Sequence, residues 1–199
     1  MPYFVFVEFG NPQVAEFLVD LRNALQCTNN HSPAHVTIRG PYQTPPSFEQ
    51  LEAYSERLQG YGVRISNYGY FSTPKGYAAF LRAECTVFRE LWHKPDYKTP
   101  LESIKPHITM FESVDRSAAL EVRAFLRNEN LLIHTYNIHL RVYESRSVQG
   151  DMFGLPTVVP PKPSQHQDVW RVPRDILERA RVVGSRLAES LERKKRSNF

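Results

Sequence analysis

Two short stretches of the chain carry the same combination of residues, and that combination is suited to proton transfer. Residues 35–38 read HVTI and residues 107–110 read HITM, with a proline just upstream of each stretch. The other five histidines lack a threonine two positions later. Imidazole titrates close to neutral pH, so one histidine can accept a proton while the other donates one.

Both stretches are expected to be β-strands, because a histidine and a threonine alternate with aliphatic residues. Side chains two residues apart on a strand point to the same face. The histidine's face then also carries Thr37 and Arg39 in the first stretch, and Thr109 and Phe111 in the second. The aliphatic residues point to the opposite face, where helices can cover them.

Two imidazoles on opposite sides of a phosphodiester permit in-line displacement without a metal. One deprotonates the attacking oxygen and the other protonates the leaving oxygen. Each threonine hydroxyl can donate to a phosphate oxygen, and Arg39 can add a forked hydrogen bond. We therefore expect His35 and His107 to be catalytic, and Thr37, Thr109 and Arg39 to bind substrate.

The surrounding sequence predicts the elements that position these stretches. Helices are expected after Asn11–Pro12, where an N-cap precedes a proline, and after Ser47, which forms a capping box with Gln50. A helix is also expected at about 115–128, and a short one around 87–92. The predicted strands cover residues 3–9, 34–39, 62–71, 77–84, 107–111 and 131–144, with a turn and a last short strand near 150–156.

This order, β-α-β-α-β-β followed by α-β-α-β-β, places a His–x–Thr strand and a following helix in each half. The repeat suggests two similar lobes, each with a sheet covered by helices on one face. On the strand of residues 131–144, Ile138, Leu140 and Val142 are expected on one face, and His139, Arg141 and Tyr143 on the other.

Over roughly residues 1–155 the chain resembles the two-histidine (2H) phosphoesterase superfamily, which includes RNA 2′,3′-cyclic phosphodiesterases and 2′-5′ RNA ligase-like proteins. The resemblance rests on HVTI, HITM and the element order. It implies an α+β, bilobal fold with two pseudo-symmetric lobes, whose antiparallel sheets face a central cleft and whose helices lie outside. It also implies His35 and His107 as acid and base, Thr37 and Thr109 as phosphate ligands, and no metal or other cofactor.

The basic character of the chain comes from its C-terminal end. The net charge is +4, but residues 171–199 hold nine Lys/Arg against four Asp/Glu, which leaves residues 1–170 near neutrality. Residues 156–173 are expected to be a proline-rich linker, and residues 174–199 an amphipathic helix with a basic tail. This helix either packs back on the domain of residues 1–155 or mediates self-association or partner binding.

Several further residues are weaker candidates. Tyr42, Phe111 and Tyr143 can stack a base, with plain packing as the alternative. Lys105 and Arg141 can attract phosphate, or can be ordinary surface residues. His31 is expected at the surface, while His134 and His139 can face the cleft without a threonine partner. No HxxxH helix or His/carboxylate cluster indicates a metal site.

These observations predict a phosphodiesterase for a nucleotide 2′,3′-cyclic phosphate, or for a 2′-5′ linked or cyclic oligonucleotide. The alternative is a protein that binds a nucleotide or RNA end in the same cleft without turnover. A bell-shaped pH profile with limbs around neutrality would distinguish the enzyme. No apolar run approaches the ~20 residues of a membrane span, no signal peptide is recognisable, and two isolated cysteines favour a cytoplasmic protein.

Overall fold

A computed structural model describes residues 2–73, 75–91, 105–144 and 166–197 of the 199-residue chain. These residues form eight strands and five helices, and the strands build two antiparallel sheets. The fold is therefore α+β, as predicted. The turn and short strand expected near 150–156 lie outside the described residues.

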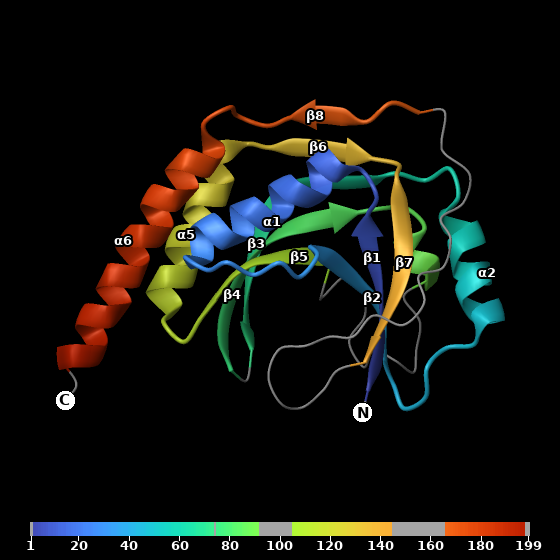
Figure 1. Ribbon diagram of the computed structural model, residues 1–199, viewed down its shortest axis with the longest axis horizontal. Coiled ribbons are helices and arrows are strands. Elements are labelled where there is room, and N and C mark those ends of the chain that lie inside the picture. Colours follow the sequence, from blue (N-terminus) through green and yellow to red (C-terminus); the bar gives the residue numbers. More distant parts are fainter. Residues whose placement is uncertain (1, 74, 92–104, 145–165, 198–199) are drawn as a thin grey trace.

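The smaller sheet, sheet A, has the strand order β2-β1-β7. Its strands are β1 (Tyr3–Phe9), β2 (His35–Tyr42) and β7 (Ile138–Glu144). The predicted alternation of β7 is confirmed, because Ile138, Leu140 and Val142 are buried in the core. The first His–x–Thr strand, β2, forms an edge of this sheet (Figure 1).

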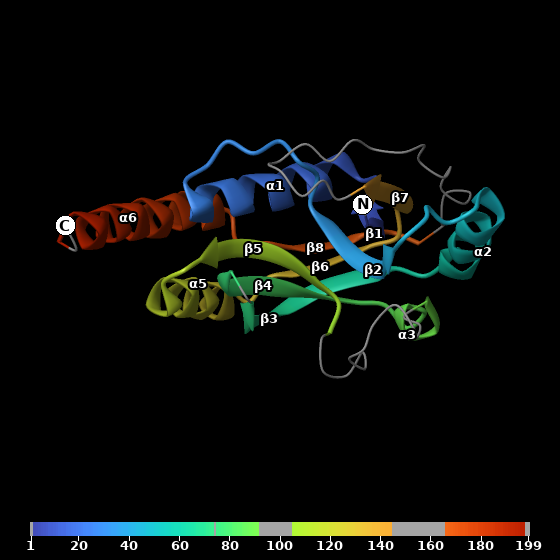
Figure 2. The ribbon, with the colours of Figure 1, turned by 90° about the horizontal axis from the view of Figure 1, so that it is seen from below.

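The larger sheet, sheet B, has the strand order β5-β4-β3-β6-β8 and is strongly curled (Figure 2). The second His–x–Thr strand, β5, forms its edge. The bounds of its strands are β3 (Val63–Thr73), β4 (Gly76–Glu84), β5 (His107–Ser113), β6 (Leu132–Thr135) and β8 (Val169–Arg171).

The two sheets do not correspond to the two halves of the sequence. The expected strand 131–144 is divided at Tyr136 and Asn137, so that β6 joins sheet B while β7 crosses to pair with β1 of sheet A. The Asn137 carbonyl accepts a 2.8 Å hydrogen bond from the Gly10 amide, which fixes the crossing point. The expectation of one continuous strand there, and of one sheet per half, was wrong.

Helix α1 (Pro12–Gln26) packs its apolar stripe between the two sheets. Asn11 caps it as predicted, and its side chain accepts from the Gln13 amide at 3.0 Å. The helix contacts β1 of sheet A and β5 of sheet B. Its buried residues belong to the same hydrophobic core as both sheets: Val14, Phe17, Leu18, Leu21, Ala24 and Leu25.

The remaining helices lie near the positions that the sequence predicts. Helix α2 (Phe48–Leu58) begins with the expected capping box, in which Ser47 and Gln50 bond each other's backbone amides. The short α3 spans Phe88–Leu91, and α5 spans Arg116–Glu129 with Asp115 as its N-cap. Helix α5 packs against β3, β4 and β5.

The C-terminal segment is part of the fold. Of the predicted linker, residues 156–165 are outside the described residues, but Val169–Arg171 form β8 and pair with β6. Asp168 accepts hydrogen bonds from Asn11 at 2.6 Å and from Thr135 at 2.8 Å, and Trp170 packs edge-on against Phe17. The segment is thereby joined to both α1 and sheet B.

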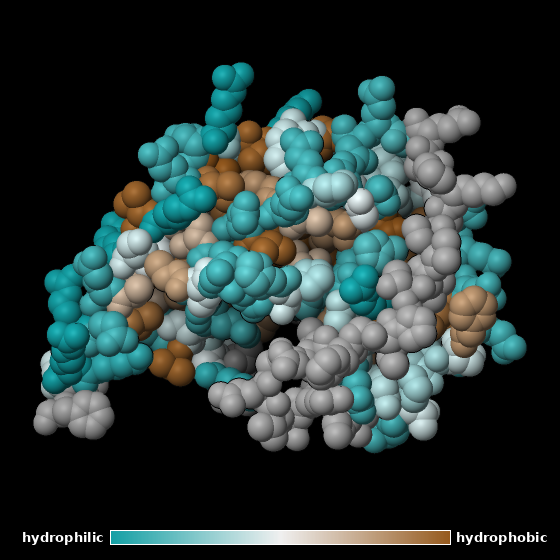
Figure 3. Space-filling model, viewed as in Figure 1, coloured by the Kyte–Doolittle hydropathy of each residue, from teal (hydrophilic) through white to brown (hydrophobic). Residues whose placement is uncertain are grey.

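Helix α6 (Ile176–Ser197) packs on α1 and runs beside α5, with mainly hydrophilic side chains facing outward (Figures 1 and 3). It comes very close to α1 at Gly184, where a Cβ atom would lie 2.1 Å from the Ala24 carbonyl oxygen. Along its length, α6 is paired with the α5 segment through Arg179 with Glu129, Arg186 with Glu121 and Lys194 with Asp115. The cationic side of each pair is exposed, so the buried stripe contributes most to holding the helix in place.

We predict that Gly184→Ala destabilises the protein although alanine favours helices. The new methyl group collides with the α1 backbone and must push the two helices apart, at a cost of about 1–3 kcal/mol. Urea unfolding measures the loss. Ser185→Ala, on the exposed side of the same helix, is the control and should leave stability within about 0.5 kcal/mol of wild type. A more stable Gly184→Ala would contradict the close packing.

Candidate functional site

The two motif histidines line one cavity of about 500 Å³, between the edge strands β2 and β5. His35 is the first residue of β2 and His107 the first of β5, and both side chains are half-buried. Thr37 and Thr109 line the same cavity. The four residues that the sequence singled out therefore come together, although β2 and β5 belong to different sheets.

The two imidazoles are held in matching ways. The Nδ1 atom of His35 lies 3.1 Å from the Pro33 carbonyl oxygen, and Nδ1 of His107 lies 3.1 Å from the Lys105 carbonyl oxygen. A carbonyl only accepts, so each Nδ1 carries the proton when these bonds form. Nε2 is then the nitrogen that remains for exchanging a proton with a bound molecule.

A phenylalanine on the neighbouring strand supports each histidine ring. Phe6 of β1 stacks on His35 with 3.8 Å between ring centroids, and Phe80 of β4 lies 4.8 Å from His107. In register, Phe6 stands opposite Thr37 and Phe80 stands opposite Thr109. The two motifs thus share their packing as well as their residue types.

Each motif strand also has a register shift immediately after its threonine. Ile38 is the extra residue of β2 between Thr37 and Arg39, and Met110 is the extra residue of β5 between Thr109 and Phe111. A β-bulge of this kind bends the strand and redirects the side chains beyond it. The predicted sharing of one face therefore ends at the threonine in both strands.

Arg39 and Tyr42 lie away from the two-histidine cavity. Arg39 is buried, donates to the Tyr54 hydroxyl at 2.6 Å and lies 5.3 Å from the Tyr42 ring centroid. Tyr54 belongs to α2, so this group fastens α2 to the end of β2. The expectation that Arg39 shares the face of His35 was wrong, because the bulge at Ile38 turns it aside.

Phe111 and Tyr143 are mostly buried. Phe111 borders the two-histidine cavity but belongs to the hydrophobic core and is 4% exposed. Tyr143 is equally buried, packs against Phe6 and donates its hydroxyl to Glu8. Little of either ring is available for stacking a base.

The weaker candidates fall into separate places. His31 is exposed, as predicted. Lys105 and His134 line a different cavity, beside sheet B. Arg141 and His139 contact the Glu8 carboxylate on sheet A, with His139 Nε2 3.2 Å from it.

Glu8 is a buried carboxylate directly opposite His35 in the β1–β2 register. Burial alone would raise its pKa, but hydrogen bonds from His139 and Tyr143 and the charge of Arg141 outweigh that effect and lower the pKa. Glu8 is therefore ionised at neutral pH. Nothing in its sequence context marked it, because these partners lie more than 130 residues away.

Arg22 is the one Lys or Arg in the described lining of the two-histidine cavity, and it was not among the residues predicted from the sequence. It projects from α1 and donates to the carbonyl oxygens of Asn30 at 3.1 Å and Ser32 at 2.5 Å, holding the loop that leads to His35. Its buried Nε has no hydrogen-bond partner among the described residues. Arg22 is the only Lys or Arg in the first 38 residues, a signal that could have drawn attention to it.

Gln26, also on α1 and also missed, ties this helix to the second motif strand. Its side-chain amide donates to the Glu112 carbonyl oxygen and accepts from the Glu112 amide, both at 2.9 Å. The glutamine thus occupies hydrogen-bonding positions on the free edge of β5. This contact fixes β5 relative to α1 and hence relative to the loop before His35.

Desolvation lowers the pKa of both motif histidines below the usual value for imidazole. For His35, the Pro33 carbonyl and Glu8 act in the opposite direction, while Arg22 and His107 lower the pKa further. Protonation of His107 therefore disfavours protonation of His35. The two rings therefore tend to gain their protons one after the other, and the singly protonated pair is the state that acid–base catalysis requires.

Comparisons with known proteins identify no family for this chain. A scan against models of protein families finds no match, and a search of curated proteins finds no similar chain. Among the described residues, no three His, Cys, Asp or Glu side chains gather as a metal site. No helix in the same part of the chain is long and apolar enough to cross a bilayer.

We predict that Glu8→Gln destabilises the fold and lowers the pKa of His35. The variant loses charge-assisted hydrogen bonds worth about 1.5–3 kcal/mol. Because the pKa of Glu8 is lowered by folding, this contribution is present above the carboxylate's usual pKa and is lost as the pH falls through its folded value. Urea unfolding at pH 7, and NMR titration of the His35 ring, test the two effects.

The matched control is Glu49→Gln, an exposed carboxylate in the first turn of α2. It should change neither the His35 titration nor stability beyond about 0.5 kcal/mol. An unchanged His35 pKa in Glu8→Gln would mean that the carboxylate does not act on the cavity.

Proposed function

We propose that this chain is a metal-independent phosphodiesterase of the two-histidine type. Its substrate is a nucleotide 2′,3′-cyclic phosphate, or a 2′-5′ linked or cyclic oligonucleotide. The observation that carries the proposal is the matched setting of His35 and His107 across one cavity. Each has the same Nδ1 contact, a threonine two residues on and a following bulge.

In the proposed reaction on a cyclic phosphate, water attacks phosphorus in line with the ribose oxygen that leaves. The deprotonated Nε2 of one histidine takes the proton from water as the new P–O bond forms. The protonated Nε2 of the other gives its proton to the leaving ribose oxygen as the ring bond breaks. Thr37, Thr109 and Arg22 supply donors to the non-bridging phosphate oxygens, and the two histidines exchange roles when the direction reverses.

The proposal includes the finer fold assignment, two pseudo-symmetric lobes of the 2H phosphoesterase kind. In support, the two motifs are related by equivalent partners on the neighbouring strands, Phe6 and Phe80. The pairing of β7 with β1 and the addition of β8 depart from a simple duplication, so the symmetry applies to the motif strands and their immediate neighbours.

The decisive experiment is turnover of an oligoribonucleotide ending in a 2′,3′-cyclic phosphate, in excess EDTA. Wild type should release a single phosphomonoester isomer, and His35→Ala and His107→Ala should each lose a factor of about 10²–10⁴. His31→Ala, at an exposed histidine that lines neither the two-histidine cavity nor the cavity beside sheet B, is the control and should stay within about threefold of wild type. If folded wild type turns over neither this substrate nor a panel of 2′-5′ and cyclic oligonucleotides, the proposal fails and non-catalytic nucleotide binding replaces it.

We further predict a bell-shaped pH profile of kcat/KM with its maximum on the acid side of about pH 6.5, the usual pKa of histidine. Folding lowers the pKa of both histidines, so the singly protonated pair is most abundant below that pH. As the pH rises, the catalytic acid loses its proton and the rate falls. Steady-state rates between pH 4.5 and 8.5 test this, and a maximum above pH 7 would contradict it.

A further inference from the structure

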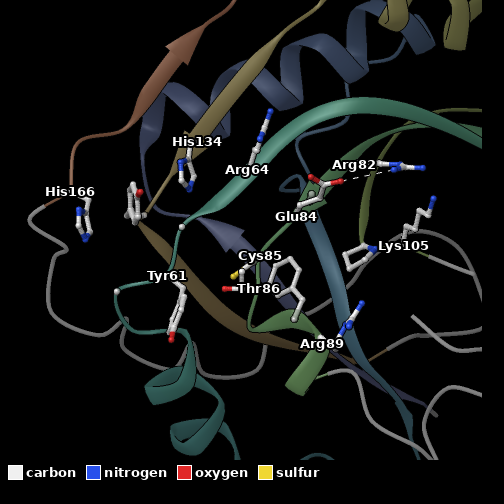
Figure 4. Close-up of a pocket in the computed structure, with 16 residues that line it drawn as sticks. Tyr61, Arg64, Arg82, Glu84, Cys85, Thr86, Arg89, Lys105, His134 and His166 are labelled. Atoms are coloured by element: carbon white, nitrogen blue, oxygen red, sulfur yellow. Dashed lines mark ion pairs between the residues drawn. The ribbon is translucent and has the colours of Figure 1, made fainter. Parts of the chain in front are cut away.

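A cavity of about 1070 Å³, more than twice the volume of the two-histidine cavity, lies beside sheet B. Side chains from β3, β4 and β6, together with α3 and the residues before β5, surround it (Figure 4). The proposed chemistry of His35 and His107 does not use it. Its size and composition therefore need an explanation of their own.

This cavity is locally cationic in a domain that is nearly neutral. Four cationic side chains line it, and Glu84 is the one carboxylate of its described lining. Glu84 lies 4.0 Å from one of the four, Arg82. The cationic residues are Arg64, Arg82, Arg89 and Lys105. Such a concentration of positive charge attracts a polyanion.

A row of rings borders the same cavity. His134 and Tyr136 have their centroids 4.7 Å apart with the planes tilted by 37°, and Tyr136 and His166 follow at 4.8 Å and 32°. Tyr61 lines the cavity on the same side in Figure 4 and is 47% exposed. Exposed rings beside cations are the usual platform for unpaired bases.

Shared lining residues connect this cationic cavity to the two-histidine cavity by way of a third cavity between them. Arg82 and Lys105 also line a middle cavity of about 710 Å³, and His107 lines both that middle cavity and the two-histidine cavity. Arg82 stands directly opposite His107 in the β4–β5 register. Three strand spacings separate β5 from β6, roughly 14 Å across the sheet.

We propose that the cationic cavity binds the nucleotides that precede the reacting end of a single-stranded RNA. This inference rests on the proposed function and narrows its substrate to an oligonucleotide. The reacting phosphate lies between His35 and His107, the strand passes Arg82, and its next phosphates and bases meet the cations and rings of the cavity. A duplex is disfavoured because the ring platform requires unstacked bases.

The experiment compares kcat/KM for a mononucleoside 2′,3′-cyclic phosphate with that for a short oligoribonucleotide bearing the same end. Wild type should prefer the oligomer at least fivefold, the value of roughly one stacked base. Arg64→Gln/Arg89→Gln should reduce this ratio by about fivefold or more and flatten its salt dependence. Arg174→Gln/Arg181→Gln removes equal charge from exposed positions outside the three cavities and should retain the wild-type ratio.

The outcomes separate this inference from the proposed function. Equal kcat/KM for the two substrates in wild type, or an unchanged ratio in Arg64→Gln/Arg89→Gln, would show that the cationic cavity does not bind the RNA strand. Either result would leave the proposed phosphodiesterase activity in place. If neither these substrates nor the 2′-5′ and cyclic oligonucleotides are turned over, the proposed function fails, and fluorescence anisotropy with the labelled oligomer decides on binding. If Arg64→Gln/Arg89→Gln binds the oligomer more weakly than the control variant does, RNA binding by the cationic cavity is supported. Equal binding of the oligomer would overturn it.

Discussion

The position of α1 between the two sheets is the constraint on which the candidate site depends. β2 and β5 are edge strands of different sheets, so no shared ladder of backbone hydrogen bonds sets the separation of His35 and His107. The apolar stripe of α1 packs into the core common to both sheets. From its polar side, Arg22 holds the loop before His35 and Gln26 holds the edge of β5. One helix thereby places both halves of the proposed catalytic pair, and α6 braces it from outside through the close contact at Gly184.

Local sequence patterns predict most of the elements and the central histidines because their signals lie within a few residues. The caps at Asn11 and Ser47, and the alternation within β7, are of this kind. The break between β6 and β7 also appears in the alternation of buried residues. Ile133 and Thr135 are buried in β6, whereas Ile138 and Leu140 are buried in β7, so the alternation slips by one residue between the two strands. Reading 131–144 as a single strand overlooked that shift, and the chain crossing between sheets was missed with it.

The site residues beyond the motifs could not be predicted in the same way, because long-range register creates them. A bulge adds one residue without changing the apparent alternation, so Arg39 was predicted on the face of His35 although the bulge at Ile38 turns it aside. Glu8 acquires its role from β7, and Gln26 from β5, through partners 86 or more residues away. The cationic cavity likewise joins side chains from β3, β4 and β6, whose individual positions on their strands are unremarkable in sequence.

The departures from symmetry at the two histidines have a chemical consequence. Opposite His35 stands the Glu8 carboxylate, which supports a proton on that ring; opposite His107 stands the Arg82 guanidinium. On the His35 side the Glu8 carboxylate is paired with Arg141 and His139, whereas on the His107 side Arg82 leads to the cationic cavity, which attracts an anionic strand. In the proposed reaction the phosphate can therefore sit between two similar acid–base groups while the rest of the strand has only one favourable direction. In the proposed function the motif pair is a nearly symmetric acid–base centre, and the cations beside His107 give the bound strand its direction.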